Sequence, residues 1–560
     1  MLRSKSWLIA QFCKFKCMEQ SGLLRSRQSK ITPIQLIYLE GCLAIFLAVG
    51  SLTWPLGGDH AFFYFVGNTI LDGGVPYRDA WELKGPLTYY IYAFIAAVFG
   101  QHEFGPRIFD LIVVGAFCWW LRRMILRLER STSAATFGVV FFLLWYLSLG
   151  FWNTAQPEEW GAFLVAIAVG LLIESSESRR HTMAAIGILI ALAVLLKPTF
   201  LIFLPLPILV LLFGGKERVF SGVPAVSCAL AFAATVTMLL TLCFWDGGLK
   251  EYWDVLRFLG SSYSPLSRRD LWAEATSFPG LLWQIGLAVP YFLALPALGL
   301  IWHTGRRRLA GLLAAWLALA ILLVLAQGTY WWYSFAPANI ATAVIIGTAL
   351  SYFTGPEKAP VVRHLITGLA ALVIALPVVA SEYSDCFFAS FSWPSYVLGA
   401  MDRSDYVEKV AAGYHIDTVE QVAAYIESHT APSDAVFVWG WESLILTMTK
   451  RHSPTRFATY EALITDGPLK TRYQQIFLAE VTHRPPRYVV VDGLSSFYRP
   501  ESSLWLLKEF EQFNRFLHRN YRPVTRIGEY EIWRQTDIDS RTRVGNRSER
   551  SDRLGAMSDK

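Results

Sequence analysis

The chain has 560 residues, of which 54% are hydrophobic and 17% are charged, and its mean hydropathy is +0.37. A soluble globular chain carries about 25% charged residues, so this composition excludes a purely soluble protein and indicates several membrane spans with a polar remainder. The net charge of +6 requires no nucleic-acid partner and fits basic loops on the cytoplasmic side of a membrane.

The N-terminal residues 1–33 are basic and contain no long apolar core. This pattern predicts a cytoplasmic leader rather than a cleavable signal peptide, and Met18 is an alternative start to Met1. Of the seven cysteines, Cys386 alone falls in the region that we place outside the membrane, so no intrachain disulfide framework is expected there.

Apolar segments of the right length predict about eleven membrane spans, since a span needs roughly 20 apolar residues. The candidate spans are 34–54, 105–126, 134–152, 159–174, 182–197, 198–213, 219–245, 279–302, 309–327, 334–353 and 364–381. The further apolar segment 86–100 would reach about 22 Å, short of a ~30 Å hydrocarbon core. If it does not cross, the cytoplasmic side receives every basic cluster, namely those within 122–130, 179–180, 216–218, 306–308 and 358–363. We therefore expect a first outer loop over 55–104 and an outer region after residue 381.

The last predicted span ends at residue 381, and the pattern of the sequence after it predicts alternating helices and strands. Residues 415–429 predict a helix with Ile416, Val419, Val422, Ala423 and Ile426 on its buried face. We predict buried strands over 435–440 and 487–492. We also predict a second amphipathic helix over 503–517 and an edge strand over 530–535. The interpretation is an extracytoplasmic α/β domain over 382–537, followed by a disordered basic tail over 538–560.

Two outer loops place acids at the ends of predicted spans. Asp59 follows the pair Gly57–Gly58, which lets the backbone turn sharply, and its loop is dense in aromatic residues. Glu158 lies in the short loop NTAQPEEWG at the head of a helix. Ordinary helix-end acids and N-terminal capping explain either residue alone. Because both face the same compartment, we also consider them candidates for catalysis.

Basic side chains on the outer side form the third group of candidates. They are Lys84, Arg107, Lys197, Arg268 and Arg269. Snorkelling at the interface accounts for any one of them, and Asp110, three residues after Arg107, could pair with that arginine. Together they place cations where the positive-inside tendency disfavours them, and a lipid phosphate would explain the arrangement.

The first outer loop carries the motifs of a known superfamily. After Asp59 come Gly74–Val75–Pro76–Tyr77–Arg78–Asp79, of the form G-x-P-Y-x-D, and Lys84–Gly85–Pro86–Leu87, of the form K-x-P-L. Residues 156–158 (QPE), 197–198 (KP) and 330–337 (YWWYSFAP) match further segments. Over residues 34–355 the chain resembles GT-C membrane glycosyltransferases. It is similar to the group of protein O-mannosyltransferases, lipid A aminoarabinose transferases and rhizobial lipopolysaccharide galacturonosyltransferases.

The resemblance implies an all-α polytopic membrane domain over 34–381 that transfers a sugar from a polyprenyl-phosphate donor to an acceptor hydroxyl. The acceptor would be an envelope glycan, a lipid or a protein, at the outer face of a bacterial inner membrane, with inversion at the anomeric carbon. Asp59 would be the general base, and Glu158 would orient the acceptor or share that role. The donor would be bound by Lys84, Tyr77, Arg78, Arg107, Lys197, Arg268 and Arg269.

No cofactor is required by this scheme. A divalent metal is possible but not indicated, because many relatives carry Asp-Glu where this chain has Asp59–His60. We therefore assign no metal ligands.

Two other function classes fit the composition. A multi-span transporter of a lipid-linked or small substrate is compatible with eleven spans, but transporters tend to show internal repeats and ionisable groups at the membrane midplane. A non-catalytic scaffold whose C-terminal domain binds a partner is the third possibility. Flux of a labelled sugar lipid across vesicles, compared with transfer to an acceptor, separates the first two classes.

Overall fold

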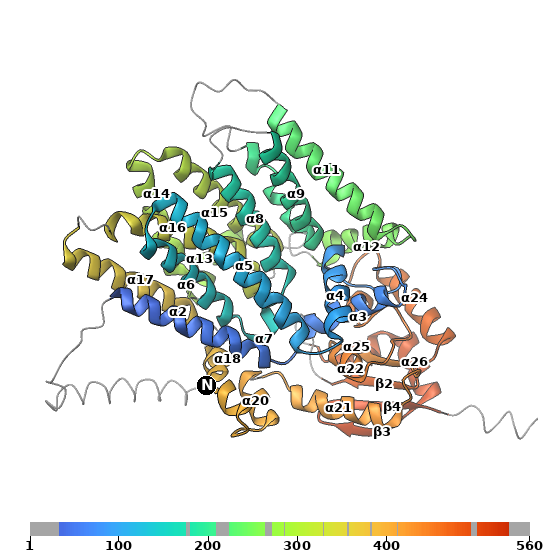
Figure 1. Ribbon diagram of the computed structural model, residues 1–560. Coiled ribbons are helices and arrows are strands. Elements are labelled where there is room, and N and C mark those ends of the chain that lie inside the picture. Colours follow the sequence, from blue (N-terminus) through green and yellow to red (C-terminus); the bar gives the residue numbers. More distant parts are fainter. Residues whose placement is uncertain are drawn as a thin grey trace, which may run out of the picture.

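The computed structural model describes residues 33–174, 180–208, 223–263, 271–284, 286–328, 330–354, 358–380, 384–411, 413–493 and 501–536. A bundle of long helices forms one end of the molecule, and a small sheet with its own helices forms the other (Figure 1). Residues 1–32 of the predicted leader, the predicted tail 538–560, and both Arg268 and Arg269 lie outside the described residues.

The bundle is built from long apolar helices. They are α2 (Pro33–Gly50), α5 (Phe104–Glu129), α6 (Thr132–Ser148), α8 (Pro157–Glu174), α9 (Arg180–Leu196), α11 (Val223–Cys243), α13 (Leu271–Gln284), α14 (Ala288–His303), α15 (Arg307–Gln327), α16 (Ala336–Thr354) and α17 (Pro360–Ala380). Short helical turns join several of them: η1 (Ser51–Thr53), α7 (Gly150–Asn153), η2 (Pro198–Phe203) and η5 (Trp332–Phe335). Helix α16 lies at the centre and contacts α5, α6, α8, α14, α15 and α17.

Within the described residues, three helices are long and apolar enough to cross a membrane: Ala225–Cys243, Arg307–Gln327 and Trp332–Thr354. The number is up to six if each of three bent helix pairs counts as one span; one pair is Tyr38–Thr53 with Gly58–Leu71, bent by 56°. Helix α11 leaves Val226, Leu230, Met238 and Leu242 exposed, as expected of a lipid-facing helix. The chain is an integral membrane protein, and the count of eleven spans stays a prediction.

The predicted span 279–302 differs from the structure. The segment is divided between the end of α13 and α14, and Gly286, between them, adopts a positive φ of 71° that interrupts the helical path. Hydropathy alone could not detect the break, because the residues on both sides of it are apolar.

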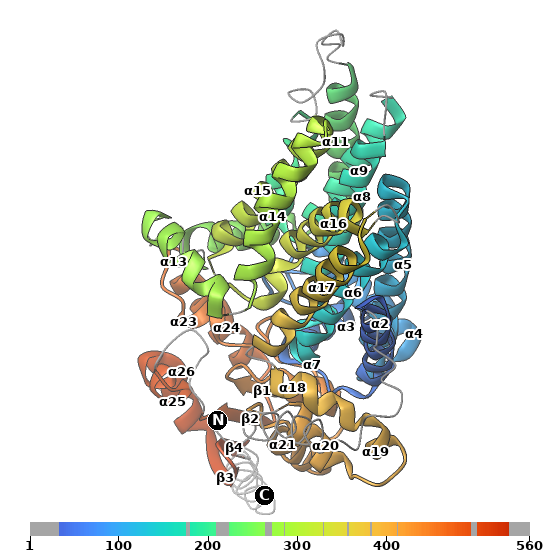
Figure 2. The same cartoon turned by 90° about the vertical axis from the view of Figure 1, so that its left-hand side faces the viewer.

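A thin layer of helices separates the bundle from the sheet. It contains α3 (Gly58–Leu71), α4 (Pro86–Phe99) and α12 (Leu249–Phe258); Figure 1 places α3 and α4 between the two ends, and Figure 2 shows α4 at the side of the bundle, next to α2. Segment 86–100, which we predicted not to cross, forms the 14-residue helix α4, which packs on α3. The first outer loop thus folds against both parts of the molecule.

The C-terminal part contains a four-stranded sheet in the order β1-β2-β4-β3, with strands β1 (Val436–Trp439), β2 (Tyr488–Asp492), β3 (Tyr521–Ile527) and β4 (Tyr530–Gln535). Strands β1 and β2 are parallel, and the other pairs are antiparallel. The helices of this part are α18 (Ser384–Ala389), η6 (Ser390–Ser392), α19 (Trp393–Val397), α20 (Arg403–Val410), α21 (Ile416–His429), α22 (Leu444–Thr449), α23 (Glu461–Ile464), α24 (Lys470–His483), α25 (Ser503–Glu509) and α26 (Glu511–Asn520).

Helix α21 buries the five apolar residues predicted for its inner face. Two expectations about this part were wrong. The predicted helix 503–517 is divided into α25 and α26 at Phe510. The predicted edge strand 530–535 is β4, which lies inside the sheet and leaves β3 at the edge. Residues 521–527 were missed as a strand because they contain Pro523 and mostly polar side chains, which an edge strand tolerates.

The C-terminal part packs directly on the first outer loop. The ring of Trp81 lies against Phe258, Phe457 and Tyr473, and its backbone N–H donates to the carbonyl of Arg456 at 2.7 Å. Arg472 of α24 forms an ion pair with Asp254 of α12 at 2.7 Å. These contacts fix the sheet end of the molecule against the layer that carries Asp59 and Lys84.

Glu442, which follows β1, predicts a pH dependence of stability. Burial, and then the nearby Asp492, raise the pKa of its carboxyl group from 4.5 to about 8. In the unfolded chain the group ionises from about pH 4.5, so its contribution to stability falls as the pH rises from there to about 8. We expect Glu442→Gln to match the parent chain in thermal midpoint at pH 5 and to exceed it at pH 9, measured on the purified protein in detergent.

The control is Glu427→Gln on the exposed face of α21, which should shift the midpoint equally at both pH values. A difference between Glu442→Gln and the parent chain that does not change with pH would contradict a buried, neutral Glu442.

Candidate active site

Four charged side chains from four separate segments meet beside the start of α3. They are Asp59 in the first turn of α3, Lys84 in the loop before α4, Glu158 in the first turn of α8, and Lys197 after α9. All four were predicted site residues, and up to 138 residues of chain separate them, from 59 to 197. The fold therefore brings together groups that the sequence could only assign to one side of the membrane.

Two lysines converge on one carboxylate oxygen. The ammonium groups of Lys84 and Lys197 each lie 2.6 Å from Oε1 of Glu158. The Glu158 side chain is 1% exposed, whereas those of Lys84 and Lys197 are 12% and 16% exposed. The carboxylate is therefore enclosed, while both cations keep some access to the surroundings. Lys197 also donates to Oε1 of Gln327 at 2.7 Å, and that oxygen accepts from Ser334 at 3.0 Å.

Asp59 lies beside this group but is held differently. Its Oδ2 accepts a hydrogen bond from the amide of Gln156 at 3.1 Å, and it lies within electrostatic range of Lys84 and Glu158. The residue is partly exposed, whereas its neighbours Gly58 and His60 are buried. Asp59 thus combines access with a hydrogen bond that orients its carboxylate. The preceding Gly57 and Gly58 lie where the chain bends by 56° into α3, and they also allow close contact with Trp152, which a Cβ atom on either residue would meet within 3.0 Å.

Lys84 is positioned through its backbone. The buried Tyr77 donates from its hydroxyl to the Lys84 carbonyl at 2.7 Å, and the Lys84 N–H donates to Glu82 at 2.9 Å. The next residue, Gly85, donates to the carbonyl of Leu196 at 2.9 Å, at the end of α9. A Cβ atom on Gly85 would lie 2.1 Å from the carbonyl oxygen of Leu195, so this close approach requires glycine. It is the contact that brings Lys84 next to Lys197.

Aromatic rings line the cationic side of the cluster. The ammonium of Lys84 lies 5.0 Å from the ring centroid of Tyr333 and 5.9 Å from that of Phe63, and Lys197 lies 5.9 Å from Tyr333. Burial alone would lower the pKa of Lys84, but the carboxylates of Glu158 and Asp59 outweigh it and raise that pKa above its usual value. Lys84 is consequently a cation at neutral pH.

Arg107 has a different environment from the one that we expected. It is buried, and its guanidinium donates to Thr154 Oγ1 at 2.7 Å and to the carbonyls of Pro55 and Phe151. These bonds connect the segment before Asp59 to the segment before Glu158. Because its donors face the chain itself, we replace the predicted phosphate contact with a positioning role. Asp110 accepts from Tyr146 and Trp160 rather than pairing with Arg107.

His60 has the same positioning role. Its Nδ1 accepts from the backbone N–H of Gly57 at 2.9 Å, so the ring proton lies on Nε2, which donates to the Thr154 carbonyl at 2.7 Å. Both ring nitrogens are occupied by backbone groups and neither is free to bind a metal. The described residues contain no group of three or more His, Cys, Asp or Glu side chains placed to hold a metal ion.

The other predicted donor ligands are more distant from the cluster. Tyr77 is buried behind Lys84, as described above. Arg78 forms an exposed ion pair with Asp79 at 2.7 Å and donates to the Asp246 carbonyl at 2.6 Å. Burial opposes ionisation of Asp79, but Arg78 and the Val75 N–H lower its pKa below the usual value. The motif G-x-P-Y-x-D therefore builds the loop that presents Lys84.

Sequence reasoning missed four neutral or acidic members of the site: Gln156, Gln327, Tyr333 and Glu82. Gln156 directly precedes the QPE acid that we selected, and Tyr333 lies in the segment YWWYSFAP that we noted for its resemblance. Glu82 accepts hydrogen bonds from the Tyr89 hydroxyl and from Lys84 N–H. The available signal was position in the predicted outer loops, but the neutral side chains of Gln156, Gln327 and Tyr333 carry no charge pattern that singles them out.

Comparison with known proteins shows what the fold of the whole chain is similar to. No protein-family model matches the sequence, and no curated protein matches it. Among solved structures, the chain is similar to ArnT from Cupriavidus metallidurans bound to undecaprenyl phosphate, with a TM-score of 0.58 and 14% identity over 90% of this chain and 98% of that one.

Two further similarities are weaker. Apo ArnT from the same organism aligns with a TM-score of 0.49 and 13% identity, covering 89% of this chain and 97% of that chain. The Archaeoglobus fulgidus oligosaccharyltransferase in its apo form aligns with a TM-score of 0.43 and 13% identity, covering 84% and 70%. The resemblance read from the first outer loop is confirmed at the level of architecture: the chain has the fold of a GT-C glycosyltransferase.

Proposed function

We propose that the chain is a membrane glycosyltransferase that moves a sugar from a polyprenyl-phosphate donor to an acceptor hydroxyl. The observation that carries the proposal is the cluster of Lys84, Glu158 and Lys197 beside a partly exposed Asp59. It combines cations for a phosphate with a carboxylate for a hydroxyl proton, which is the set of groups that this reaction needs. Support comes from the fold, because the similar ArnT structure holds undecaprenyl phosphate.

Asp59 is the better candidate for the general base. Glu158 accepts from two ammonium groups at 2.6 Å, and a carboxylate in that position holds a proton poorly. Asp59 accepts a neutral amide bond from Gln156 and keeps an exposed edge. In the proposed step Asp59 takes the proton of the acceptor hydroxyl, and the oxygen attacks the anomeric carbon. The bond from that carbon to the phosphate oxygen breaks on the opposite face, which gives inversion.

The leaving group is a polyprenyl phosphate that carries one more negative charge than it had as a diester. Lys84 and Lys197 would stabilise that charge by charge-assisted hydrogen bonds. Glu158 keeps these two like charges close together when no donor is bound, since it lies between them. Tyr333 and Phe63, over the lysines, offer flat apolar surfaces that suit a sugar face or a lipid tail.

The test of this function is transfer itself. Membranes that contain the chain, and matched membranes without it, are incubated with labelled polyprenyl-phosphate sugars extracted from the host and with its envelope fraction. We expect label to move from the organic phase to an envelope glycan, lipid or protein when the chain is present. Label that crosses sealed vesicles without changing its chemical form would instead support the transporter.

The proposal includes a topology with eleven spans, a cytoplasmic leader, and residues 382–560 at the outer face of a bacterial inner membrane. We expect a cysteine introduced at Ser131 to react with a membrane-impermeant maleimide only after the cell is opened, and one at Ser433 to react in intact cells. The parent chain gives the background from its own cysteines. Labelling of position 131 in intact cells would contradict the eleven-span arrangement.

A further inference from the structure

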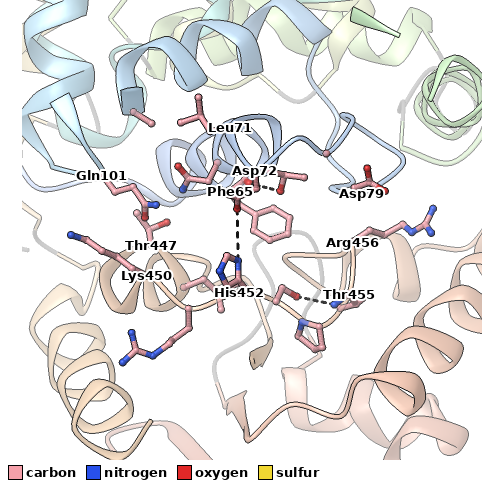
Figure 3. Close-up of a pocket in the computed structure, with 18 of the residues that line it drawn as sticks. Phe65, Leu71, Asp72, Asp79, Gln101, Thr447, Lys450, His452, Thr455 and Arg456 are labelled. Carbon is pink, nitrogen blue, oxygen red and sulfur yellow. Dashed lines mark hydrogen bonds and ion pairs between the residues drawn. The ribbon is translucent and has the colours of Figure 1, made fainter. Parts of the chain in front are cut away.

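A second polar site lies at the far end of α3 from Asp59. A groove with a volume of about 730 Å³ runs between the C-terminal half of α3, the end of α4, and the segment 446–456, which begins within α22 and continues past its end. Figure 3 shows Lys450, His452 and Thr455 on one wall facing Leu71 and Asp72 on the other. The 13 residues from Asp59 to Asp72 span about 20 Å of helix, so this groove is separate from the Asp59 cluster.

The walls of the groove carry more positive than negative charge. Five lysine and arginine side chains and three carboxylates line it. Two of the carboxylates form ion pairs with arginines of the lining, Asp79 with Arg78 at 2.7 Å and Glu480 with Arg456 at 2.6 Å, and Asp72 lies 3.9 Å from the ring of His452. Within the described part of the chain, Lys450, Arg451 and Arg484 form no ion pair. The groove therefore has an unbalanced positive charge.

One of these cations is fixed in place by neutral groups. Arg451 donates from Nε to the Thr430 hydroxyl at 2.9 Å and from its terminal nitrogens to the carbonyls of Thr449 and Thr430 at 2.7 and 3.0 Å. Neutral acceptors orient the guanidinium without cancelling its charge. Lys450, directly before it, has φ of 52°, a left-handed conformation that favours glycine over lysine. This residue is the C-cap of α22, where a left-handed conformation is common, and it is one of the residues that line the groove.

The polar and apolar residues of the groove indicate the chemical class of its ligand. The side-chain amides of Asn68 and Gln101 line the groove and have no hydrogen-bond partner among the described residues. Two apolar side chains, Phe65 and Leu71, also line the groove, and Leu71 is exposed by half of its surface. Cations and free amides beside exposed apolar side chains match a molecule with an anionic polar end and an apolar end.

We propose that this groove binds the phosphate-bearing headgroup of an anionic lipid at the membrane surface. Lys450, Arg451 and Arg484 contact the phosphate, Asn68 and Gln101 bind hydroxyl groups of the headgroup, and the acyl chains leave the groove along Leu71. The groove joins the first outer loop to the C-terminal part, so a bound headgroup would hold the two together. This site is independent of the donor site and of whether the chain transfers a sugar.

The test uses the purified full chain in detergent and three probes: dioctanoyl phosphatidylglycerol, dioctanoyl phosphatidylcholine and inorganic phosphate. The variant Lys450→Gly/Arg484→Ala removes two cations, and glycine at 450 suits the left-handed backbone, so the fold should be retained. We expect phosphatidylglycerol to bind this variant about 30-fold more weakly, since each basic residue near a charged surface contributes roughly a factor of five. Salt should weaken binding to the parent chain more than to the variant.

The matched control is Lys508→Ala/Arg519→Ala, which removes the same charge from exposed positions of α25 and α26 that do not line the groove. It should bind phosphatidylglycerol like the parent chain, and all three proteins should bind phosphatidylcholine weakly and equally. Equal phosphatidylglycerol affinity of the parent chain and Lys450→Gly/Arg484→Ala would overturn the proposal. Inorganic phosphate that binds as tightly as phosphatidylglycerol would also overturn the proposal, because the groove would then recognise phosphate alone and not a lipid.

Discussion

Replacing Asp59 by asparagine should reduce sugar transfer by about 10²–10⁴-fold, the usual share of general acid–base catalysis, and leave the fold intact. Asparagine has nearly the same shape, and its amide can still pair with Gln156, the hydrogen-bond partner of Asp59 in the structure. It cannot accept the proton of an acceptor hydroxyl. The measurement is the initial rate of transfer by purified protein at saturating donor and acceptor, with the thermal midpoint as the check on folding.

Asp246→Asn provides the matched control, because Asp246 is an exposed acid in the loop between α11 and α12 and its side chain is not part of the cluster. It should transfer at the parental rate. The loss in Asp59→Asn should be mainly in turnover, and the decline of the rate toward acid pH that a carboxylate base causes should disappear. Normal expression with near-normal transfer by Asp59→Asn would remove the catalytic role and leave only the fold.

The sequence predicted the charged members of the site because charge at an outer helix end is conspicuous in an apolar chain. Asp59, Lys84, Glu158 and Lys197 each interrupt or end an apolar segment. A charge pattern indicates on which side of the membrane a residue lies, but it does not indicate which other residues lie next to it. The convergence of two lysines on one oxygen of Glu158 depends on the contact of Gly85 with the end of α9, which is a matter of backbone packing between distant segments.

Arg107 shows where the same reasoning fails. An arginine at the head of a span looks the same in sequence whether it faces a lipid phosphate or the protein's own carbonyl groups. In the fold it donates to Thr154, Pro55 and Phe151. Those acceptors belong to irregular backbone between helices, which needs donors when it is buried. Such a need becomes visible only when the path of both segments is known.

Some secondary-structure elements could likewise be predicted from the sequence, and others could not. Helix α21 was predictable because its apolar residues recur with helical spacing, and β1 and β2 because short apolar runs lie between polar ones. Strand β3 has an exposed face and a proline, and it is a strand because it pairs with β4. The break at Phe510 and the break near Gly286 likewise depend on tertiary packing rather than on local pattern.

Replacing Lys84 by methionine should lower kcat/KM for the lipid-linked donor by about 10–10²-fold. Methionine keeps an apolar stem against Phe63 and Tyr333 but loses a charge-assisted hydrogen bond to phosphate, which contributes about 1.5–3 kcal/mol. The fold should survive because Lys197 still pairs with Glu158. Both KM for the donor and kcat should change, since the phosphate gains charge as the bond breaks. Lys250→Met, at an exposed position of α12, is the control and should leave both constants unchanged.

A set of combined variants distinguishes two causes of inactivity. One is the loss of cations that contact the donor, and the other is destabilisation of the fold by an unpaired buried charge. Lys84→Met/Lys197→Met leaves Glu158, 1% exposed, without a cation, and breaking a buried pair in this way costs about 3–5 kcal/mol. That protein should be destabilised as well as inactive. Adding Glu158→Gln removes the unpaired charge, so the triple variant should recover the parental thermal midpoint yet stay inactive, because nothing then binds the departing phosphate. Recovery of transfer in the triple variant would show that the lysines serve Glu158 and the fold rather than the donor.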